Sequence, residues 1–497
     1  MKEPLYIAVD LGAGSGRVIA AGISDKELLL HEIRRFQYTP VRRNGHLGWH
    51  AAEIISQIKA GLHDASDWAN GNGRTVASLG VDSWGTDYGF VDADGRLCED
   101  PVCYRDNRTQ KVVENVFGIV SRKEIFSRTG IQFLVFNTIF QLAAHKQAGI
   151  PKTAVRLLMI PDLIHFLLTG IPVAEYTNAT TTQMVSARNG KWDKDLLKTL
   201  GLPIHLLPDI VPAGTDLGLM RPIVGRELGL SDSHVVAPAT HDTASAVVGV
   251  PLEKDYAYIS SGTWSLVGVE RSDSLINPDV ERHNFTNEGG AFATFRFLKN
   301  VMGLWILESC RREWQQRDTD IDYRNMLQHL TLMDECPGLI FPDDPRFLNP
   351  GSMLKAVADQ LKENRFNTPE DPFIFTRVIL DSLALRYASV LRTIEILTGQ
   401  KIAGVHIVGG GAQNDYLNQA TSTLTDLPVL AGPIEATAIG NIIVQAIRDG
   451  RFKSLSEARR HVAKNVKLKE FYPRPTGAWR AAADRYATIE TRYSPGS

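Results

Sequence analysis

The segment VDLGAGSGRV, residues 9–18, constrains the fold of this chain most strongly, because its glycines directly follow an apolar strand. A dinucleotide-binding G-x-G-x-x-G loop has its third glycine where this sequence has Arg17, and it opens a helix. The residues that follow the turn, VIAAGI, are apolar and rich in β-branched side chains, which favours a second strand. The segment therefore predicts a strand, a glycine turn and a strand, and not a dinucleotide-binding unit.

Three strand-like segments precede the first helical pattern. Apolar runs at residues 5–9, 18–23 and 28–36 are separated by turns, and apolar residues at helical spacing follow from Ala51. A further strand, TVASLGVD, comes after that helix. Consecutive strands without intervening helices do not fit a doubly wound parallel sheet, whose strands need crossover connections. The sequence therefore predicts a mixed sheet with an antiparallel flank.

The strand, turn, strand pattern returns near residue 256, where YAYIS and WSLVGVE flank the turn SGT at 261–263. The length of 497 residues also exceeds the size at which a single hydrophobic core keeps growing. We therefore expect two duplicated α/β lobes, residues 1–248 and 249–497, with a ligand-binding cleft between them. Weak repeats also arise by chance, so the repeat alone leaves a single-copy arrangement open.

Composition argues against several classes of partner. The formal net charge of −2 gives no electrostatic reason to expect nucleic acid or an anionic membrane as a partner. The most apolar stretch, LLMIPDLIHFLLTGIPV, is interrupted by Pro161, Asp162 and His165, which indicates a buried core segment and no membrane span. The N-terminus lacks the apolar core of a secretory signal, and the four cysteines show no metal-ligand spacing. We expect a cytoplasmic protein with reduced thiols that acts on a small metabolite.

Three turns that follow strands offer backbone N–H groups to phosphate oxygens. They are the glycine turn at residues 12–16, SSGT at 260–263 and GGG at 409–411. Each alone is more typical of an ordinary tight turn, for which glycine is the usual residue. Together with the duplicated strands they favour a nucleotide-binding cleft. The absence of a G-x-x-x-x-G-K-[ST] motif excludes the P-loop class.

Charged residues flank two of the predicted strands. Asp10 ends the first strand and could hold a divalent cation through water, while Arg17 could offer its guanidinium group to phosphate. Asp242 follows the apolar segment VVAPAT and opens a helix of small residues. It is either a helix cap or the general base that accepts the proton of a hydroxyl attacking a γ-phosphate. His241, beside it, is expected to orient the substrate.

Other polar segments could bind a polyhydroxylated ligand, which requires dense polar groups and an aromatic face. Trp84 and Tyr104 lie in two such segments, and EYTNATTTQ at 175–183 forms a third. The same residue types favour solvated turns regardless of function. Asn300 precedes an apolar helical segment, where it either contacts a ligand or caps the helix.

Passages spread over almost the whole chain resemble the FGGY carbohydrate kinases, a branch of the actin-like, ribonuclease-H-like ATPases. They include VDLGAGSGR, DSWGTDYGF, SHVVAPATHDTASAV, SSGTWSLVG, TNEGGAF and HIVGGGAQN. The resemblance implies two ribonuclease-H-like α/β domains with mixed β-sheets around an interdomain cleft, ATP as phosphate donor and Mg²⁺ as cofactor. EYTNATTTQ and LKNVMGLW resemble the members that phosphorylate the 1-hydroxyl of L-rhamnulose.

The resemblance also implies roles for individual residues, with Asp242 as the proton acceptor. The residues that it implies for ATP binding are Ala13, Gly14, Ser15, Gly16, Arg17, Thr263, Glu308 and Gly410. Those that it implies for sugar binding are Gly85, His241, Asp242, Thr243 and Asn300. Glu308 departs from the family pattern, because a glutamine is expected there and an ionised carboxylate cannot donate a hydrogen bond.

Two alternatives remain open on the sequence. Another FGGY kinase, acting on L-fuculose or D-xylulose, would share the ATP-binding residues and differ only in its sugar-facing loops. A non-kinase ATPase of the actin type would share the glycine turns and the duplication, but it would transfer phosphate to water and would need no base beside a sugar. The sequence does not decide the oligomeric state.

Overall fold

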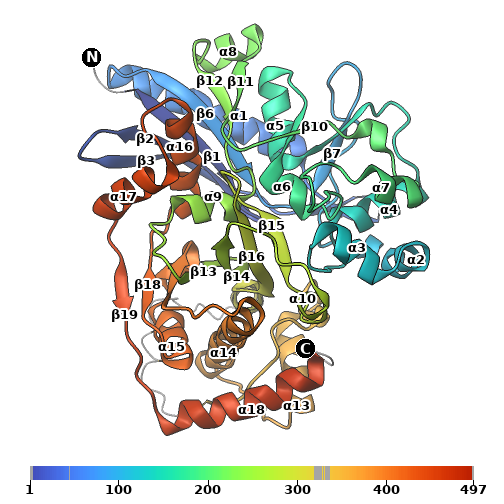
Figure 1. Cartoon of the computed structure of the whole chain (residues 1–497), viewed down its shortest axis with the longest axis vertical. Helices are drawn as coiled ribbons and strands as arrows, with labels where there is room; N and C mark the ends of the chain where they lie inside the picture. The colour runs from blue at the N-terminus through green and yellow to red at the C-terminus, as the bar shows by residue number, and fades with distance from the viewer. Residues whose placement is uncertain (1–3, 44, 318–326, 328–329, 331–335, 495–497) are drawn as a thin grey trace.

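The computed structural model describes residues 4–494, apart from residues 44, 318–326, 328–329 and 331–335. Its centre is formed by two large β-sheets, one from each half of the sequence (Figure 1). Both sheets are mixed, and helices cover their faces. The predicted fold class, α/β with two mixed sheets, is confirmed.

The first sheet has the strand order β11-β12-β6-β1-β2-β3. β1 pairs antiparallel with β2 and parallel with β6, and β2 continues antiparallel into β3. This is the antiparallel flank that the sequence predicts. The strands are β1 (Leu5–Leu11), β2 (Ser15–Ile23), β3 (Leu28–Gln37), β6 (Val76–Ser83), β11 (Thr215–Leu219) and β12 (His234–Ala237).

The second sheet repeats this arrangement, with the order β15-β16-β14-β13-β17-β18-β19. β13 pairs antiparallel with β14 and parallel with β17, as β1 does with β2 and β6. The predicted strand, turn, strand repeat is therefore confirmed. The strands are β13 (Tyr256–Ser261), β14 (Trp264–Arg271), β15 (Thr286–Gly289), β16 (Phe295–Met302), β17 (Gly404–Val408), β18 (Val429–Ala431) and β19 (Lys469–Phe471).

Further elements surround the first sheet on one side (Figure 1). The helices are α1 (Ala51–Gly71), α2 (Val112–Ile119), α3 (Arg122–Thr129), α4 (Thr138–Ala148), α5 (Ile160–Thr169), α6 (Tyr176–Thr181), α7 (Lys194–Thr199) and α8 (Pro222–Leu228). Short strands pair in twos: β4 (Val41–Arg43) with β5 (His46–Gly48), β7 (Tyr88–Val91) with β8 (Arg156–Met159), and β9 (Val173–Glu175) with β10 (Asp209–Val211).

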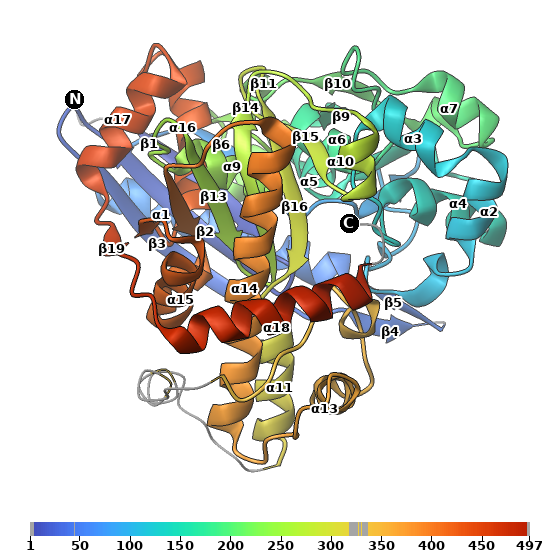
Figure 2. The same cartoon turned by 60° about the horizontal axis from the view of Figure 1, so that its bottom comes forward.

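The second sheet packs on a long central helix, α14 (Pro372–Thr398), whose N-cap is Asp371 and which ends at Gly399 in the left-handed region. The C-terminal helix α18 runs across α14 (Figure 2). Helix α9 (Asp242–Gly249) connects the two halves. The other helices that the structure describes in the second half are α10 (Pro278–Arg282), α11 (Trp305–Gln315), α13 (Met353–Glu363), α15 (Asp415–Thr425), α16 (Ala436–Arg448), α17 (Leu455–Asn465) and α18 (Gly477–Tyr493).

A different helix covers each face of the first sheet. Successive side chains of β1 point to opposite faces, so neighbouring residues of this strand pack on different helices. Ile7 and Val9 pack in the core that contains Ile58 of α1. Tyr6 and Ala8 pack on the opposite face, in the core that contains Ile439 of α16. α16 therefore completes the first sheet, although it comes from the second half of the sequence.

Helix α9 lies against α16 and connects the two sheets. Its Ala244 and Val248 belong to the core of the first sheet, and its Val247 packs with β13 and β14 of the second. The approach of the two helices requires glycine on both sides. A Cβ on Gly249 would lie 2.1 Å from the carbonyl oxygen of Ala436, and one on Gly440 would lie 1.7 Å from that of Ser245.

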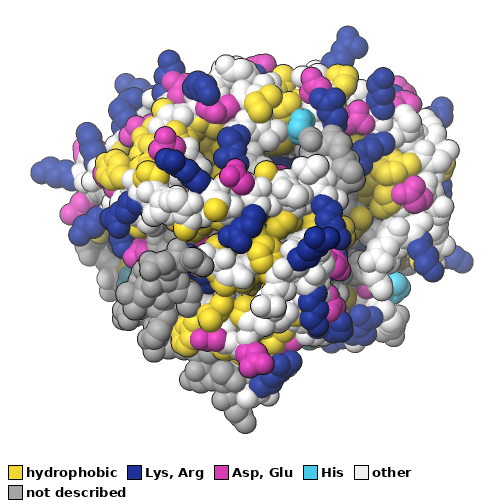
Figure 3. Space-filling view, turned by 90° about the horizontal axis from the view of Figure 1, so that it is seen from below, with side chains coloured by type: hydrophobic (Ala, Val, Ile, Leu, Met, Phe, Trp, Pro, Cys, Tyr) yellow, Lys and Arg dark blue, Asp and Glu magenta, His cyan; other side chains and the backbone are white. Residues whose placement is uncertain are grey.

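The surface, the helices and the thiols each give a further observation. Basic and acidic side chains are mixed with hydrophobic ones on the face seen in Figure 3. None of the helices described is long and apolar enough to span a bilayer. The thiols Cys98, Cys103, Cys310 and Cys336 are free, as the sequence predicts.

We predict that Gly440→Ala destabilises the protein by about 1–3 kcal/mol, because the added methyl must displace backbone atoms of α9. Gly71→Ala is the matched control, since a Cβ there, in the last turn of α1, meets no atom within 4 Å. Urea unfolding of both variants measures the difference. Equal stability of Gly440→Ala and the unmodified protein would contradict the close approach of α9 and α16.

Candidate active site

A cavity of about 270 Å³ lies between the two sheets and is lined by residues from both halves of the chain. Its walls are the turn after β1, the turn after β13, the start of α9, the segment at residues 84–86 and the segment at residues 131–137. Of the predicted site residues, those that line it are Asp10, Ala13, Arg17, Gly85, His241, Asp242, Thr243, Thr263, Asn300 and Gly410. Segments more than two hundred residues apart in sequence therefore meet in one site.

The predicted phosphate turns lie along this cavity. Tyr38 donates from its hydroxyl to the Gly12 carbonyl oxygen at 2.5 Å and fixes the first turn. The GGG turn lies directly on the turn after β13: a Cβ on Gly411 would lie 2.0 Å from Ser261 Oγ. Gly409 has φ 79° and borders Ser261 as well. Glycine at these positions allows the close contact between the second and third turns.

Four predicted ATP residues do not line the cavity. Gly14 and Ser15 belong to the first turn and its continuation, while Gly16 lies within β2 opposite Leu11. A Cβ on Gly16 would lie 2.4 Å from the Phe36 ring, so packing explains this glycine. The fourth, Glu308, is an exposed residue of α11 that pairs with Arg311 at 2.7 Å.

Asn300 lies within β16, so the expectation that it caps a helix is wrong. Helix α11 begins only at Trp305, with Leu304 at the N-cap position. The Asn300 backbone N–H and side-chain amide both donate to Gln132 Oε1, at 2.8 and 3.1 Å. The side chain is thereby held at the cavity wall by a residue from the other lobe.

Asp242 is the first residue of α9, but its carboxylate does not close the helix as a cap. His241 is the N-cap residue and makes no side-chain cap bond. The Asp242 carboxylate accepts from the backbone N–H of Thr243 at 2.5 Å, and its side chain remains 29% exposed. Burial raises the pKa of Asp242, His241 lowers it and Asp10 raises it further. The result is a carboxylate that faces the cavity with a strengthened affinity for a proton.

Asp10 and Arg17 lie opposite each other on β1 and β2. Arg17 donates to Asp10 through Nε at 2.9 Å and through Nη2 at 2.7 Å, and it also pairs with Glu435. The guanidinium group predicted to bind phosphate is therefore neutralised by two carboxylates. Those partners raise the pKa of Arg17 in spite of its burial.

A third carboxylate, Asp82, is fully buried beside this pair. Its Oδ2 accepts from Asn441 of α16 at 2.6 Å, and its Oδ1 has no hydrogen-bond partner in the part of the chain that the structure describes. Burial raises the pKa of Asp82 well above its ordinary value, and the negative charge of Asp10 raises it further. An unsatisfied oxygen next to Asp10 fits a site for a hydrated cation.

The described residues contain no cluster of three or more His, Cys, Asp or Glu side chains that could hold a metal ion. Mg²⁺ does not require one, because it keeps several waters and is usually held by one or two carboxylates together with substrate phosphates. Asp10 and Asp82 meet that requirement.

The aromatic wall of the cavity is held by a buried carboxylate, Asp87. Its Oδ2 accepts from the indole N–H groups of Trp49 and Trp84, at 2.7 and 3.0 Å, and from the backbone N–H of Tyr104 at 3.1 Å. The predicted aromatic residues Trp84 and Tyr104 both line the cavity. A flat apolar surface beside polar groups suits the C–H faces of a sugar.

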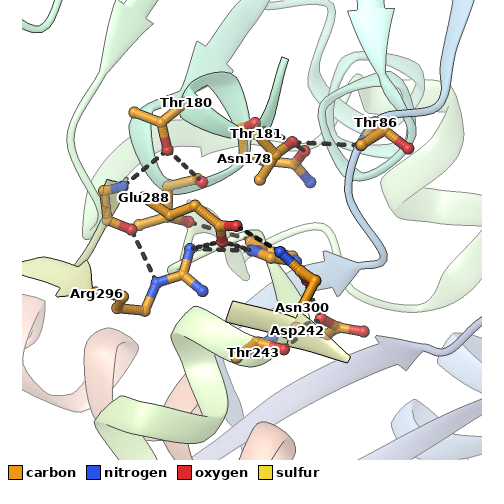
Figure 4. A network of polar contacts seen from close by, with 12 residues as sticks. Thr86, Asn178, Thr180, Thr181, Asp242, Thr243, Glu288, Arg296 and Asn300 are labelled. Carbon is orange, nitrogen blue, oxygen red and sulfur yellow. Dashed lines mark hydrogen bonds and ion pairs between the residues drawn. The ribbon is translucent and has the colours of Figure 1, made fainter. Parts of the chain in front are cut away.

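Sequence reasoning missed Glu288 and Arg296, two charged residues that lie next to His241. Figure 4 shows Glu288, Arg296 and Asn300 converging on the start of α9, with Thr180 and Thr181 above them. Glu288 and Thr181 line the cavity. Arg296 is fully buried within the apolar strand FRFLKNVM. A charged residue between two phenylalanines of a strand was the signal that could have indicated it.

Comparison with known proteins gives two matches to family models. Residues 5–249 match the N-terminal domain of the FGGY family of carbohydrate kinases, and residues 257–448 match its C-terminal domain. This chain belongs to the FGGY family of carbohydrate kinases. It is accordingly an ATP-dependent sugar phosphotransferase.

Relatives of this FGGY kinase include rhamnulokinases. That of Pectobacterium carotovorum is 42% identical over 483 residues, covering 95% of each chain. That of Bacteroides thetaiotaomicron is 38% identical over 485 residues, covering 97% of this chain and 98% of the other. Similar solved structures include gluconate kinase from Lactobacillus acidophilus (TM-score 0.80, 14% identity, 99% and 98% covered) and Plasmodium falciparum glycerol kinase with ADP (TM-score 0.77, 13% identity, 99% and 98% covered). At these identities the structures show a shared fold.

We predict that Asp82→Asn stabilises this kinase at neutral pH in metal-free buffer. A carboxyl group whose pKa is raised on folding costs no stability below its unfolded pKa, about 3.9, and costs up to about 1.4 kcal/mol per pH unit as the pH rises toward its folded value. The difference between variant and unmodified protein should therefore be absent near pH 4 and grow with pH.

Urea unfolding from pH 5 to pH 8 with EDTA measures this difference. Asp232→Asn, in an exposed turn, is the control and should follow the unmodified protein at every pH. If the unfolding free energies of Asp82→Asn and of the unmodified protein, plotted against pH, ran parallel, the Asp82 carboxyl would not be held neutral by the fold.

Proposed function

We propose that this FGGY kinase transfers the γ-phosphate of ATP to the 1-hydroxyl of L-rhamnulose, giving L-rhamnulose 1-phosphate and ADP, and that it acts in the cytoplasm. The observation that carries the proposal is the position of Asp242. Its carboxylate faces a cavity that is bordered by three glycine-containing turns and by an aromatic and polar wall. Relatives named rhamnulokinase, about 40% identical over nearly the whole chain, support the choice of sugar.

Asp242 performs the acid–base step in this proposal. It accepts the proton of the 1-hydroxyl as that oxygen attacks the γ-phosphorus, and the bond from phosphorus to the ADP oxygen breaks. Burial and the nearby Asp10 raise the proton affinity of Asp242, which favours this transfer. Gly85, His241, Thr243 and Asn300 are proposed to position the sugar, since they line the same cavity.

The remaining site residues are proposed to handle the nucleotide. The turn at residues 12–15, of which Gly12 and Ala13 line the cavity, and the turn after β13, with Thr263, would offer backbone N–H groups to phosphate oxygens. Gly410 would allow close approach of the nucleotide. Mg²⁺, when bound, would neutralise charge on the transferred phosphoryl group. Asp10, with Asp82 beside it, would hold that ion through water. The lobes themselves are proposed to be residues 1–248 and 249–497.

Asp242→Asn should lower kcat by about 10²-fold or more, because the amide cannot accept the proton and a general base typically contributes a factor of that size to the rate. The Kd for ATP should change little, since Asp242 is proposed to contact the sugar. A coupled ADP-release assay and calorimetric titration with ATP measure the two quantities. Near-normal turnover of a folded Asp242→Asn protein would refute the assignment of the base.

L-Rhamnulose should give the highest kcat/KM in a panel with L-fuculose and D-xylulose. The same ADP-release assay, run in parallel without sugar, separates phosphotransfer from hydrolysis of ATP. An equal or higher kcat/KM for either of the other ketoses would reassign the substrate within the FGGY family. Release of ADP at the same rate without any sugar would favour the actin-type ATPase.

A further inference from the structure

Arg296 is fully buried and has no direct role in the proposed phosphotransfer. Burial of a charged group lowers the stability of a fold, so the presence of Arg296 at this position requires another explanation. It lies on β16, where its Nε donates to the Gly289 carbonyl oxygen at 3.0 Å. Its Nη2 donates to His241 Nδ1 at 3.0 Å and is 3.1 Å from Glu288 Oε2. The guanidinium group therefore touches the residue that precedes the proposed base.

The contact with Arg296 restricts where His241 can carry its proton. A guanidinium group has five N–H donors and no acceptor, so His241 Nδ1 must be unprotonated to accept from it. A neutral imidazole with a bare Nδ1 carries its hydrogen on Nε2. His241 Nε2 lies 3.4 Å from Asp242 Oδ1, on the side of the cavity.

Glu288 competes for the same nitrogen. Its Oε2 lies 3.4 Å from His241 Nδ1, and a carboxylate there would favour hydrogen on Nδ1. Burial alone would raise the pKa of Glu288, but the positive charge of Arg296 lowers it overall, so this group is a carboxylate. One nitrogen cannot accept from Arg296 and donate to Glu288 at once. The contact from Arg296 is shorter by 0.4 Å and has hydrogen-bond geometry, whereas that with Glu288 is an ion-pair contact only.

We infer that Arg296 is a positioning residue that holds His241 as the neutral tautomer with its hydrogen on Nε2. Together with the proposed function, this makes His241 a hydrogen-bond donor toward the sugar and leaves Asp242 as the single proton acceptor beside it. The charged groups that face His241 are Arg296 from β16, Glu288 from β15 and Asp242 from α9. Without Arg296, two carboxylates would flank the imidazole, and Nδ1 would face the acceptor Glu288 instead of a donor.

The tautomer can be measured directly on the full-length enzyme without substrate. Long-range ¹H–¹⁵N correlation spectra of protein labelled at histidine distinguish a bare ring nitrogen from a protonated one. A His241→Gln spectrum identifies the signals of His241 among those of the thirteen histidines. We expect Nδ1 to appear unprotonated and Nε2 protonated near pH 7. Hydrogen on Nδ1 in the unmodified protein, in either the other tautomer or the cation, would overturn the inference, whatever sugar the enzyme uses.

Two variants separate Arg296 from Glu288. Arg296→Lys keeps a positive charge for Glu288, but a single ammonium cannot reproduce the planar fork that reaches Gly289 and His241 together. We expect hydrogen to appear on His241 Nδ1 in this variant. Glu288→Gln removes the competing carboxylate and should leave the tautomer as it is in the unmodified protein. The reverse pattern, a shift in Glu288→Gln and none in folded Arg296→Lys, would assign the tautomer to Glu288.

Kinetics provide a second readout. Arg296→Lys should lower kcat/KM for the sugar by about tenfold or more, the scale of one lost charge-assisted hydrogen bond, with the KM for ATP unchanged. Arg459→Lys is the matched control, because Arg459 likewise bonds a carboxylate, Glu270, and a backbone carbonyl, that of Val247, away from the cavity. An equal loss in both variants, or an equal rise of both KM values, would indicate a structural role for Arg296 only.

Discussion

The crossing of α9 and α16 is the contact on which the arrangement of the site depends. Gly249 and Gly440 allow the two helix backbones to approach closely, and neither tolerates a Cβ without displacement of a main-chain carbonyl. α16 completes one face of the first sheet, and α9 packs on both sheets. The first residue of α9 is Asp242. The position of the proposed base relative to both lobes is therefore set by helix packing and not by a loop.

Buried charge is the second constraint. Asp10 raises the pKa of both Asp82 and Asp242 beyond the effect of burial, and Arg17, paired with Asp10, offsets only part of this effect. Such an arrangement destabilises an empty protein, because each carboxylate loses hydration without a full set of partners. It suits a protein that binds a hydrated cation and a proton-donating hydroxyl. We interpret the unsatisfied oxygen of Asp82 and the raised pKa of Asp242 as stability given up for the reaction.

The sequence predicted the elements with strong local signals. Strand, glycine turn, strand at residues 5–23, its repeat at 256–271 and the helix after GGG all occur, since periodicity and turn residues determine them locally. The position of α16 on the first sheet was not predictable, because it depends on a contact between residues about 430 positions apart. Asn300 was expected directly before a helix, but that helix starts five residues later, at Trp305, and Asn300 lies within β16. Arg296 stands between two phenylalanines, which was a local sign of burial, but its partner His241 lies 55 positions away in the sequence and could not be predicted.

In the proposed reaction, phosphate passes from ATP to the sugar oxygen beside Asp242. The measurement that tests it most directly is the ³¹P–¹H correlation spectrum of the products formed from ATP and L-rhamnulose. We expect one phosphomonoester whose phosphorus couples to the two C1 methylene protons, formed in equal amount with ADP. Phosphorus coupled to a methine proton, or inorganic phosphate as the only product beside ADP, would contradict it.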